Sequence, residues 1–223
     1  MEEIKKIITA FQTAGYISLL AARFLEEKGV VKDIGGIDLD EMSQFSVIKN
    51  GEMLSPVRML EGKDFIIITS HIPLQINAVS SLSKKVIDLY KEKNASQMIA
   101  LDGLSIEKPQ DKSNVYFAST YTEKEIKNCK KLPEGAMMGF NSYIANQCRN
   151  LGIPFIVLMA ETHNEIPDGI AAAALIDVLG EFIDLKIDTS ELVSEYKKTL
   201  IQINNLVKRL DKTPKNEEQN MYV

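Results

Sequence analysis

The segment Phe65-Ile66-Ile67-Ile68-Thr69 decides the fold class of this chain. It is apolar without interruption and rich in β-branched residues, which is typical of a strand buried on both faces of a largely parallel sheet. Similar short runs stand before and after it, separated by segments with helical periodicity. The other strands that we expect cover residues 7–11, 30–37, 97–101, 115–118 and 154–159.

The helices between these strands are marked by their apolar spacing and by the residues at their ends. Thr122 with Glu125 and Asp188 with Glu191 stand three residues apart, as in a capping box. Asn50-Gly51 predicts a β-hairpin between residues 45 and 60, because this dipeptide adopts the positive φ angles of a tight turn. The helices that we expect cover residues 18–27, 75–93, 139–152 and 168–183, with two more that begin near residues 122 and 188.

Strands that alternate with helices predict an α/β fold with three layers, in which a mostly parallel sheet lies between helices. The hairpin makes this a mixed sheet with an antiparallel edge. We expect a single domain over residues 1–210, because no linker-like segment precedes residue 211. Residues 211–220 contain no apolar side chain and cannot pack, so residues 211–223 are expected to form a flexible C-terminal tail.

The composition fits a globular protein without a prosthetic group. Of the 223 residues 45 % are hydrophobic, which is enough for a core that needs no disulfide, metal or cofactor. The net charge of −5 argues against a nucleic-acid partner. Cys129 and Cys148 have no metal-site spacing and are expected as free thiols. The sequence contains neither a signal peptide nor a membrane span, so we expect a soluble, cytoplasmic protein without a membrane partner.

Polar residues follow three of the expected strands, where open α/β sheets place their ligands. They are Ser70-His71, Asp102 and Glu161-Thr162-His163. A hydrolase or phosphorylase could use His71 or His163 as the base and a carboxylate to orient it. The alternative is that these groups satisfy the turns at the strand ends, since the sequence has no nucleophile elbow, P-loop or dinucleotide-binding motif. Gly15 likewise serves either an anion site or simply a turn.

The final helix and the chain end carry apolar residues in unusual places. Met221-Tyr222-Val223 follows the polar spacer, and a hydrophobic-Tyr-X ending arises by chance in roughly 1 % of chains. A ring with a hydroxyl, an adaptable methionine and a free carboxylate together make a compact binding element. The helix before it has a stripe that packs either on its own domain or on another subunit. The stripe consists of Tyr196, Leu200, Ile203, Val207 and Leu210.

Several stretches resemble the proteasome assembly chaperone family of the second type, including its archaeal members. The best match is residues 166–179, a proline-aspartate start followed by an alanine-rich helix, and then residues 185–192. Residues 15–25 are similar to the family's first helix, residues 101–104 to its turn after a strand, and residues 139–144 to its next helix start. The resemblance covers about residues 5–195.

This resemblance implies a nucleoside-phosphorylase-like α/β fold without that enzyme's catalytic residues. It implies a protein that is not an enzyme, forms homo-oligomers and binds the proteasome α-ring subunits through a C-terminal hydrophobic-Tyr-X motif. Residue by residue, that motif falls on Met221, Tyr222 and Val223. The rival expectation is a small-molecule enzyme that uses His71 and His163, which requires both histidines and Asp102 to face one pocket.

Overall fold

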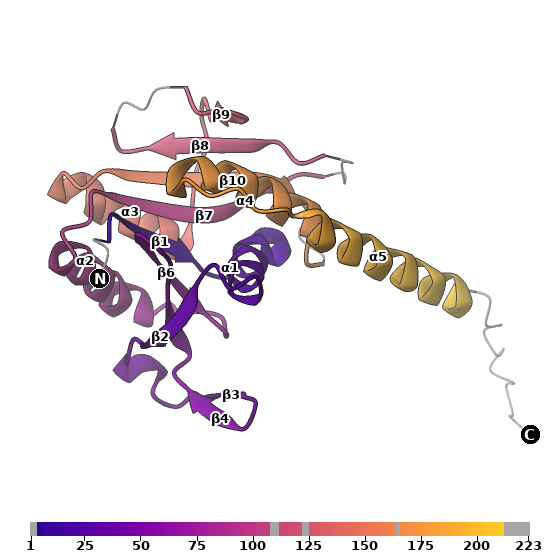
Figure 1. The fold of residues 1–223 in the computed structure, drawn as a ribbon, viewed down its shortest axis with the longest axis horizontal. Helices are drawn as coiled ribbons and strands as arrows, with labels where there is room; N and C mark the ends of the chain where they lie inside the picture. The colour runs from indigo at the N-terminus through magenta and orange to yellow at the C-terminus, as the bar shows by residue number, and fades with distance from the viewer. Residues whose placement is uncertain (1–3, 108–111, 122–124, 164–165, 212–223) are drawn as a thin grey trace, which may run out of the picture.

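The computed structural model describes residues 4–107, 112–121, 125–163 and 166–211, with side chains up to Gln202. Within these ranges the chain forms one eight-stranded sheet with helices on both faces, and a separate two-stranded hairpin (Figure 1). The order of strands is β2-β5-β6-β1-β7-β10-β8-β9. Their bounds are β1 Lys6–Ala10, β2 Lys32–Gly36, β5 Val57–Glu61, β6 Phe65–Ser70, β7 Gln97–Ser105, β8 Val115–Ser119, β9 Cys129–Lys131 and β10 Phe155–Thr162.

The sheet is mixed, as the sequence predicts. Its centre, β6-β1-β7-β10, is parallel, whereas β5 pairs antiparallel with β6 and β8 pairs antiparallel with β10. Two helices cover each face of this sheet. They are α1 (Ile17–Glu27) and α4 (Gly169–Ile183) on one face, and α2 (Ala78–Glu92) and α3 (Gly139–Leu151) on the other.

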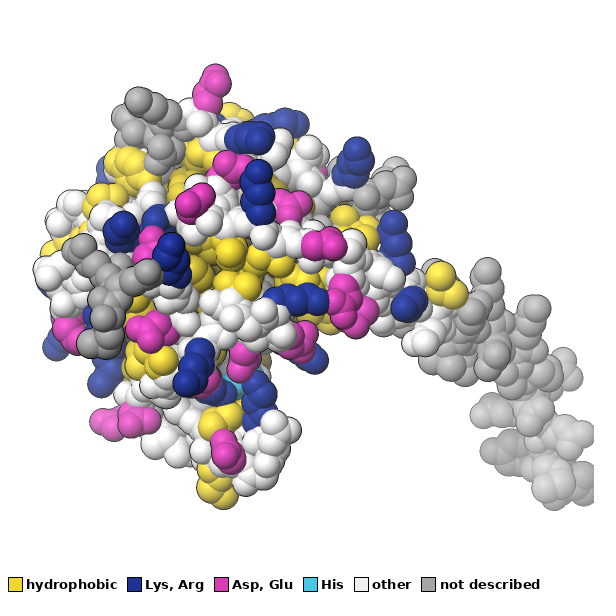
Figure 2. All heavy atoms as spheres, viewed as in Figure 1, with side chains coloured by type: hydrophobic (Ala, Val, Ile, Leu, Met, Phe, Trp, Pro, Cys, Tyr) yellow, Lys and Arg dark blue, Asp and Glu magenta, His cyan; other side chains and the backbone are white. Residues whose placement is uncertain are grey.

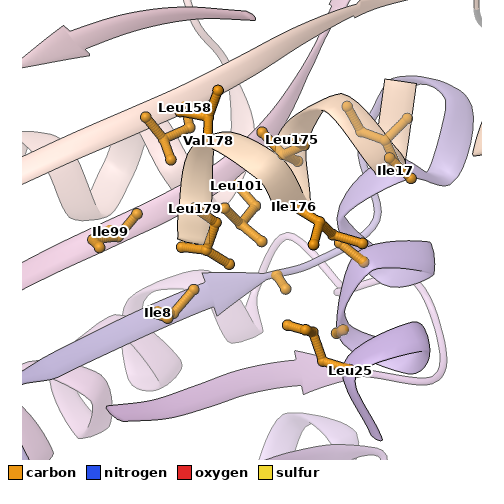
Figure 3. Packing of buried hydrophobic residues seen from close by; sticks show 14 of the residues in the cluster. Ile8, Ile17, Leu25, Ile99, Leu101, Leu158, Leu175, Ile176, Val178 and Leu179 are labelled. Atoms are coloured by element: carbon orange, nitrogen blue, oxygen red, sulfur yellow. The ribbon is translucent and has the colours of Figure 1, made fainter. Parts of the chain in front are cut away.

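Successive side chains along each strand point to opposite faces of the sheet, and this divides the core into two clusters. Ile8 and Ile67 point toward α1 and α4, where Figure 3 shows Ile8 beneath Leu179. Their neighbours Ile7 and Ile66 point toward α2 and α3. Because β6 is buried along its whole length, its uninterrupted apolar sequence is the expected signature of a strand covered on both sides.

Two local predictions need correction. The turn at Asn50-Gly51 does join a hairpin, β3 (Val47–Lys49) with β4 (Glu52–Leu54), but residues 56–60 are not its second strand. They belong to β5 of the main sheet instead. The helix expected from Thr122 is wrong: Asn128 has a left-handed φ of 58° and Cys129–Lys131 forms strand β9 beside β8. Residues 122–124 lie outside the described ranges.

The last helix, α5 (Ser190–Asp211), starts on α4 and then leaves the body (Figure 1). Leu192 and Tyr196 are buried, and a Cβ at Gly169 of α4 would lie 2.6 Å from the Tyr196 Cβ, so only glycine permits this approach. Ile201 is already 60 % exposed. The apolar stripe therefore packs on α4 at its start, and the side chains of Ile203, Val207 and Leu210 lie outside the described set. No helix in the described ranges is long and apolar enough to cross a membrane.

Candidate functional site

The residues singled out by the sequence lie at the edge of the sheet where β1, β6, β7 and β10 end, called here the carboxyl edge. Ser70 ends β6, Asp102 lies in the last part of β7, and Thr162 ends β10. Their place on the carboxyl side of the sheet agrees with the sequence prediction. The strands run further than predicted, however, so that Asp102 lies within β7 and Thr162 within β10 rather than after them. What the side chains do there differs from one position to the next.

The centre of the carboxyl edge is filled by the chain's own turn, the short helix η1 (Ala14–Tyr16). A Cβ at Gly103 of β7 would lie 2.6 Å from the Ala14 carbonyl oxygen, so the turn touches the strand directly. Gly15 has a left-handed φ of 60°, and its carbonyl accepts a hydrogen bond from the Asp168 N–H at 2.9 Å. Gly15 thus serves a packed turn, with no room for a phosphate between it and the strands.

The side chain of Asp168 locks this turn to the start of α4. One of its carboxylate oxygens accepts hydrogen bonds from the N–H groups of Ile170 and Ala171 and so caps the helix. The other accepts a hydrogen bond from the Thr162 hydroxyl at 2.9 Å. The prediction that Asp168 begins this helix is confirmed, and its carboxylate is fully used in structural contacts.

Asp102 lies on the opposite face of the sheet, among groups contributed by α3. Its carboxylate accepts hydrogen bonds from the Asn141 side-chain amide at 3.0 Å and from the Gly103 N–H at 2.8 Å. The same amide also donates to the Leu101 carbonyl at 3.1 Å. Burial raises the pKa of Asp102, and these two donors oppose the shift. The group therefore anchors α3 to β7.

The Glu161 carboxylate forms hydrogen bonds with residues in and next to β8, and not with a histidine. Its carboxylate accepts hydrogen bonds from the Asn114 side chain at 2.6 Å and from the Tyr116 hydroxyl at 3.2 Å. The His163 backbone carbonyl accepts a hydrogen bond from the Thr162 hydroxyl at 3.3 Å. Neither contact orients the His163 ring as a base.

His71 belongs to a charged group that the sequence does not reveal. Its Nε2 lies 3.3 Å from the guanidinium of Arg58, which is only 5 % exposed and also pairs with Asp33. A guanidinium can only donate, so His71 must accept through Nε2 and carry its proton on Nδ1. Partial burial, and then the charges of Arg58 and Lys49, lower the pKa of His71. These surroundings therefore favour the neutral imidazole over the charged form.

A cavity of about 580 Å³ opens beside His71, between α1 and the β3–β4 hairpin. Two ion pairs line it, Arg23 with Glu27 and Lys49 with Glu26, so its charges are already balanced. The hydroxyls of Thr69 and Ser70 donate to the backbone carbonyls of Ala10 and Ile72. The polar groups of the cavity are thus occupied by partners within the chain.

The structure does not bring His71, His163 and Asp102 to one pocket, as the hypothesis of a small-molecule enzyme requires. His71 lines the cavity, whereas Asp102 and His163 do not. Three strand spacings, roughly 14 Å, separate β6 from β10 at this edge. In the described part of the chain no three His, Cys, Asp or Glu side chains come close enough to hold a metal ion.

Two features of this region were not predicted from the sequence. Arg58 is one, because a single arginine within a short strand carries no motif and its partners come from β2 and the loop after β6. The other is a set of exposed apolar side chains at the carboxyl edge, whose exposure depends on tertiary packing. The predicted docking residues Met221, Tyr222 and Val223 lie outside the described ranges.

Comparison with known proteins supplies the family context. The PAC2 family model matches residues 7–207. The protein MJ0106 of Methanocaldococcus jannaschii is 26 % identical over 193 residues, which cover 85 % of this chain and 79 % of that protein.

Solved structures show the same fold. Pyrococcus furiosus PbaA, described as an archaeal homolog of proteasome-assembly chaperone, superposes with a TM-score of 0.85 at 24 % identity, covering 95 % of this chain and 92 % of PbaA. Pyrococcus furiosus PbaB, described as an archaeal proteasome activator, superposes with a TM-score of 0.74 at 18 % identity, covering 92 % of this chain and 96 % of PbaB.

Proposed function

The chain belongs to the PAC2 family, and from that premise we propose that it binds the proteasome α-ring through Met221-Tyr222-Val223 and acts in proteasome assembly or activation. The observation that carries the proposal is the course of α5, which starts on α4 and then runs out from the body (Figure 1). Nine residues, 212–220, then lie between the helix and the motif, enough for a reach of about 30 Å.

Each residue of the motif has a distinct role in this proposal. Tyr222 buries its ring and offers its hydroxyl, Met221 fills an irregular apolar gap, and the Val223 carboxylate pairs with a lysine of the ring. The descriptions of PbaA and PbaB support the choice of partner. The protein acts by binding and not by catalysis, since the histidines and Asp102 serve separate parts of the fold.

We also propose a soluble, cytoplasmic homo-oligomer in which residues 211–223 act as a tail separate from the folded residues 1–210. Several tails on one oligomer raise the affinity for a ring of repeated subunits without any new contact, provided that each spacer reaches a pocket. The proposal therefore requires all tails of the oligomer to point to the same side.

The test is a pull-down of recombinant proteasome α-rings by the full-length protein and by two variants. Deletion of residues 221–223 and Tyr222→Ala should both abolish binding, while circular dichroism and the unfolding midpoint stay unchanged. Asn220→Ala, one residue before the motif, is the matched control and should bind like the wild type. Retention of the ring by both tail variants would refute the docking motif.

A further inference from the structure

The most exposed apolar side chains of the described residues lie on segments at one edge of the sheet. Four large apolar residues are at least 70 % exposed: Ile48 (70 %), Met53 (79 %), Ile76 (92 %) and Met138 (89 %). We call them the apolar edge residues. Exposure of this degree is close to that in an unfolded chain, and such side chains mark interaction surfaces when they occur together.

All four lie at the carboxyl edge, as the topology shows. Ile48 and Met53 face each other across the β3–β4 hairpin, in a segment that ends at β5, whose first residue Val57 pairs with Ser70 at the end of β6. Ile76 lies between the end of β6 and the start of α2. Figure 2 shows apolar side chains at the outer end of the hairpin region.

Met138 reaches the same edge by way of α3. It directly precedes Gly139, the first residue of this helix. The third residue, Asn141, donates a hydrogen bond to Asp102 in the second half of β7. Hydrogen bonds connect the elements that carry the four residues: Glu41, before the hairpin, accepts from Ser81 of α2, and Ser80 of α2 bonds to Tyr143 of α3. The opposite edge of the sheet has Leu151, which is 51 % exposed.

The last helix leaves the body from this same edge. Tyr196 of α5 packs against Gly169, the first residue of α4, and α4 begins just after β10 ends. Fifteen further residues of α5 follow Tyr196 up to Asp211, a length of about 22 Å. The last described helix therefore ends on the side of the carboxyl edge.

We propose that the apolar edge residues form a second contact with the same proteasome α-ring that takes up the C-terminal tail, an inference that rests on the proposed function. For several tails to meet one ring, the copies of this chain must stand side by side with every α5 directed toward the ring. The carboxyl edge then faces the ring, and contacts between copies fall on the lateral surfaces. The tail provides reach, and the edge provides a broad contact once the tail is seated.

The charge of the segment around the hairpin indicates the chemistry of the surface that this part of the edge meets. Residues 37–56 contain four acidic side chains and one lysine, Lys49, which is already paired with Glu26. The four acidic residues are Asp38, Asp40, Glu41 and Glu52. The part of the ring that meets the hairpin should therefore be apolar and flanked by lysine or arginine, and binding through it should weaken as salt concentration rises.

The experiment measures the dissociation constant for recombinant α-rings and the oligomer mass of full-length variants. Ile76→Gln with Met138→Gln, and separately Ile48→Gln with Met53→Gln, should each weaken binding about tenfold or more, because they remove apolar area from the contact. Leu151→Gln, on the opposite edge, is the matched control and should stay within about twofold of wild type. The oligomer mass should be the same in all variants.

The outcomes separate this inference from the proposed function. If deletion of residues 221–223 abolishes binding while both edge variants bind like wild type, the inference is overturned and the docking tail stands. A lower oligomer mass in the edge variants would also overturn it, since the edge would then join copies of this chain. If the wild-type protein does not bind the ring at all, both the proposed function and this inference are wrong.

Discussion

The carboxyl edge of the sheet has two regions that the same topology builds in opposite ways. At its centre, η1 lies against the paired ends of β7 and β10, so that a Cβ at Gly103 would lie 2.6 Å from the Ala14 carbonyl oxygen. At its side, the β3–β4 hairpin stands away from the body and leaves a cavity of about 580 Å³ next to His71. The position where α/β sheets usually bind a ligand is filled, and the open space lies beyond it.

The difference between the two regions indicates which part of the edge is available for binding. A filled centre removes the ligand crevice, so the strand-end residues Asp102 and Asp168 become structural anchors. An open side retains exposed apolar groups and a hairpin, which suit a protein partner better than a small substrate. The comparison predicts that substitutions at the centre affect folding, whereas those at the side affect local behaviour and binding.

The largest effect is expected for Gly103→Val at the centre. The added Cβ would lie 2.6 Å from the Ala14 carbonyl oxygen and 2.8 Å from the Ala14 Cβ, and a backbone atom cannot turn aside as a side chain can. We expect a loss of about 3 kcal/mol in the free energy of unfolding, measured by urea denaturation. Gly29→Ala is the control: it has no neighbour within 4 Å of its Cβ, and its φ of 69° should cost only about 1 kcal/mol. Equal losses of stability in the two variants would contradict the close packing of η1 against β7.

A smaller effect is expected for Asp168→Ala, also at the centre. This change removes the cap of α4 and leaves the buried Thr162 hydroxyl without its carboxylate partner, so we expect a loss of about 2 kcal/mol. Asp188→Ala removes an exposed carboxylate that accepts from the Ser190 N–H at the start of α5, and should cost about 0.5 kcal/mol. Urea unfolding of both variants checks the difference. A larger loss for Asp188→Ala would show that the centre is not the more tightly built region.

Much of this architecture could be predicted from local sequence patterns. The uninterrupted apolar run of β6, the glycine after α3 and the aspartate before α4 are signals read within a few residues, and all three were confirmed. The capping-box spacing at Thr122 failed because such a signal needs an apolar helical face behind it. Strand β9 is determined instead by its pairing with β8, which local spacing does not encode.

The site could be predicted only in part. The positions of His71 and His163 directly after β6 and β10 follow from the alternation of elements, and the structure confirms them, whereas Asp102 lies within β7, which continues to Ser105. The two histidines do not converge because β1 and β7 lie between β6 and β10, and Asp102 stays apart because its carboxylate bonds to Asn141 of α3. His71 contacts Arg58, and Arg58 pairs with Asp33. These residues lie in separate segments of the sequence, so no sequence motif predicts their contact.

The smallest effect is expected at the open side, in the pH dependence contributed by His71. Its surroundings are Arg58 of β5, Lys49 of β3 and Glu26 of α1, and the net result of burial and of the two cations is a lowered pKa. The unfolded chain then binds a proton more readily than the folded one, so folding stability falls as the pH drops below the unfolded value of about 6.5. The loss is complete only below the pKa of the folded protein. Because His71 remains exposed in part, the change is modest.

His71→Asn tests this, since an asparagine carbonyl can still accept from Arg58 but does not titrate. Urea unfolding of both proteins at pH 7.5, 6.5 and 5.5 should show the wild type losing more stability than the variant as the pH falls. All carboxylates titrate alike in the two proteins, so the difference between the curves isolates His71. Parallel curves would mean that the contact with Arg58 does not depend on a neutral imidazole, and the open side of the edge would then lack the electrostatic constraint that distinguishes it from the packed centre.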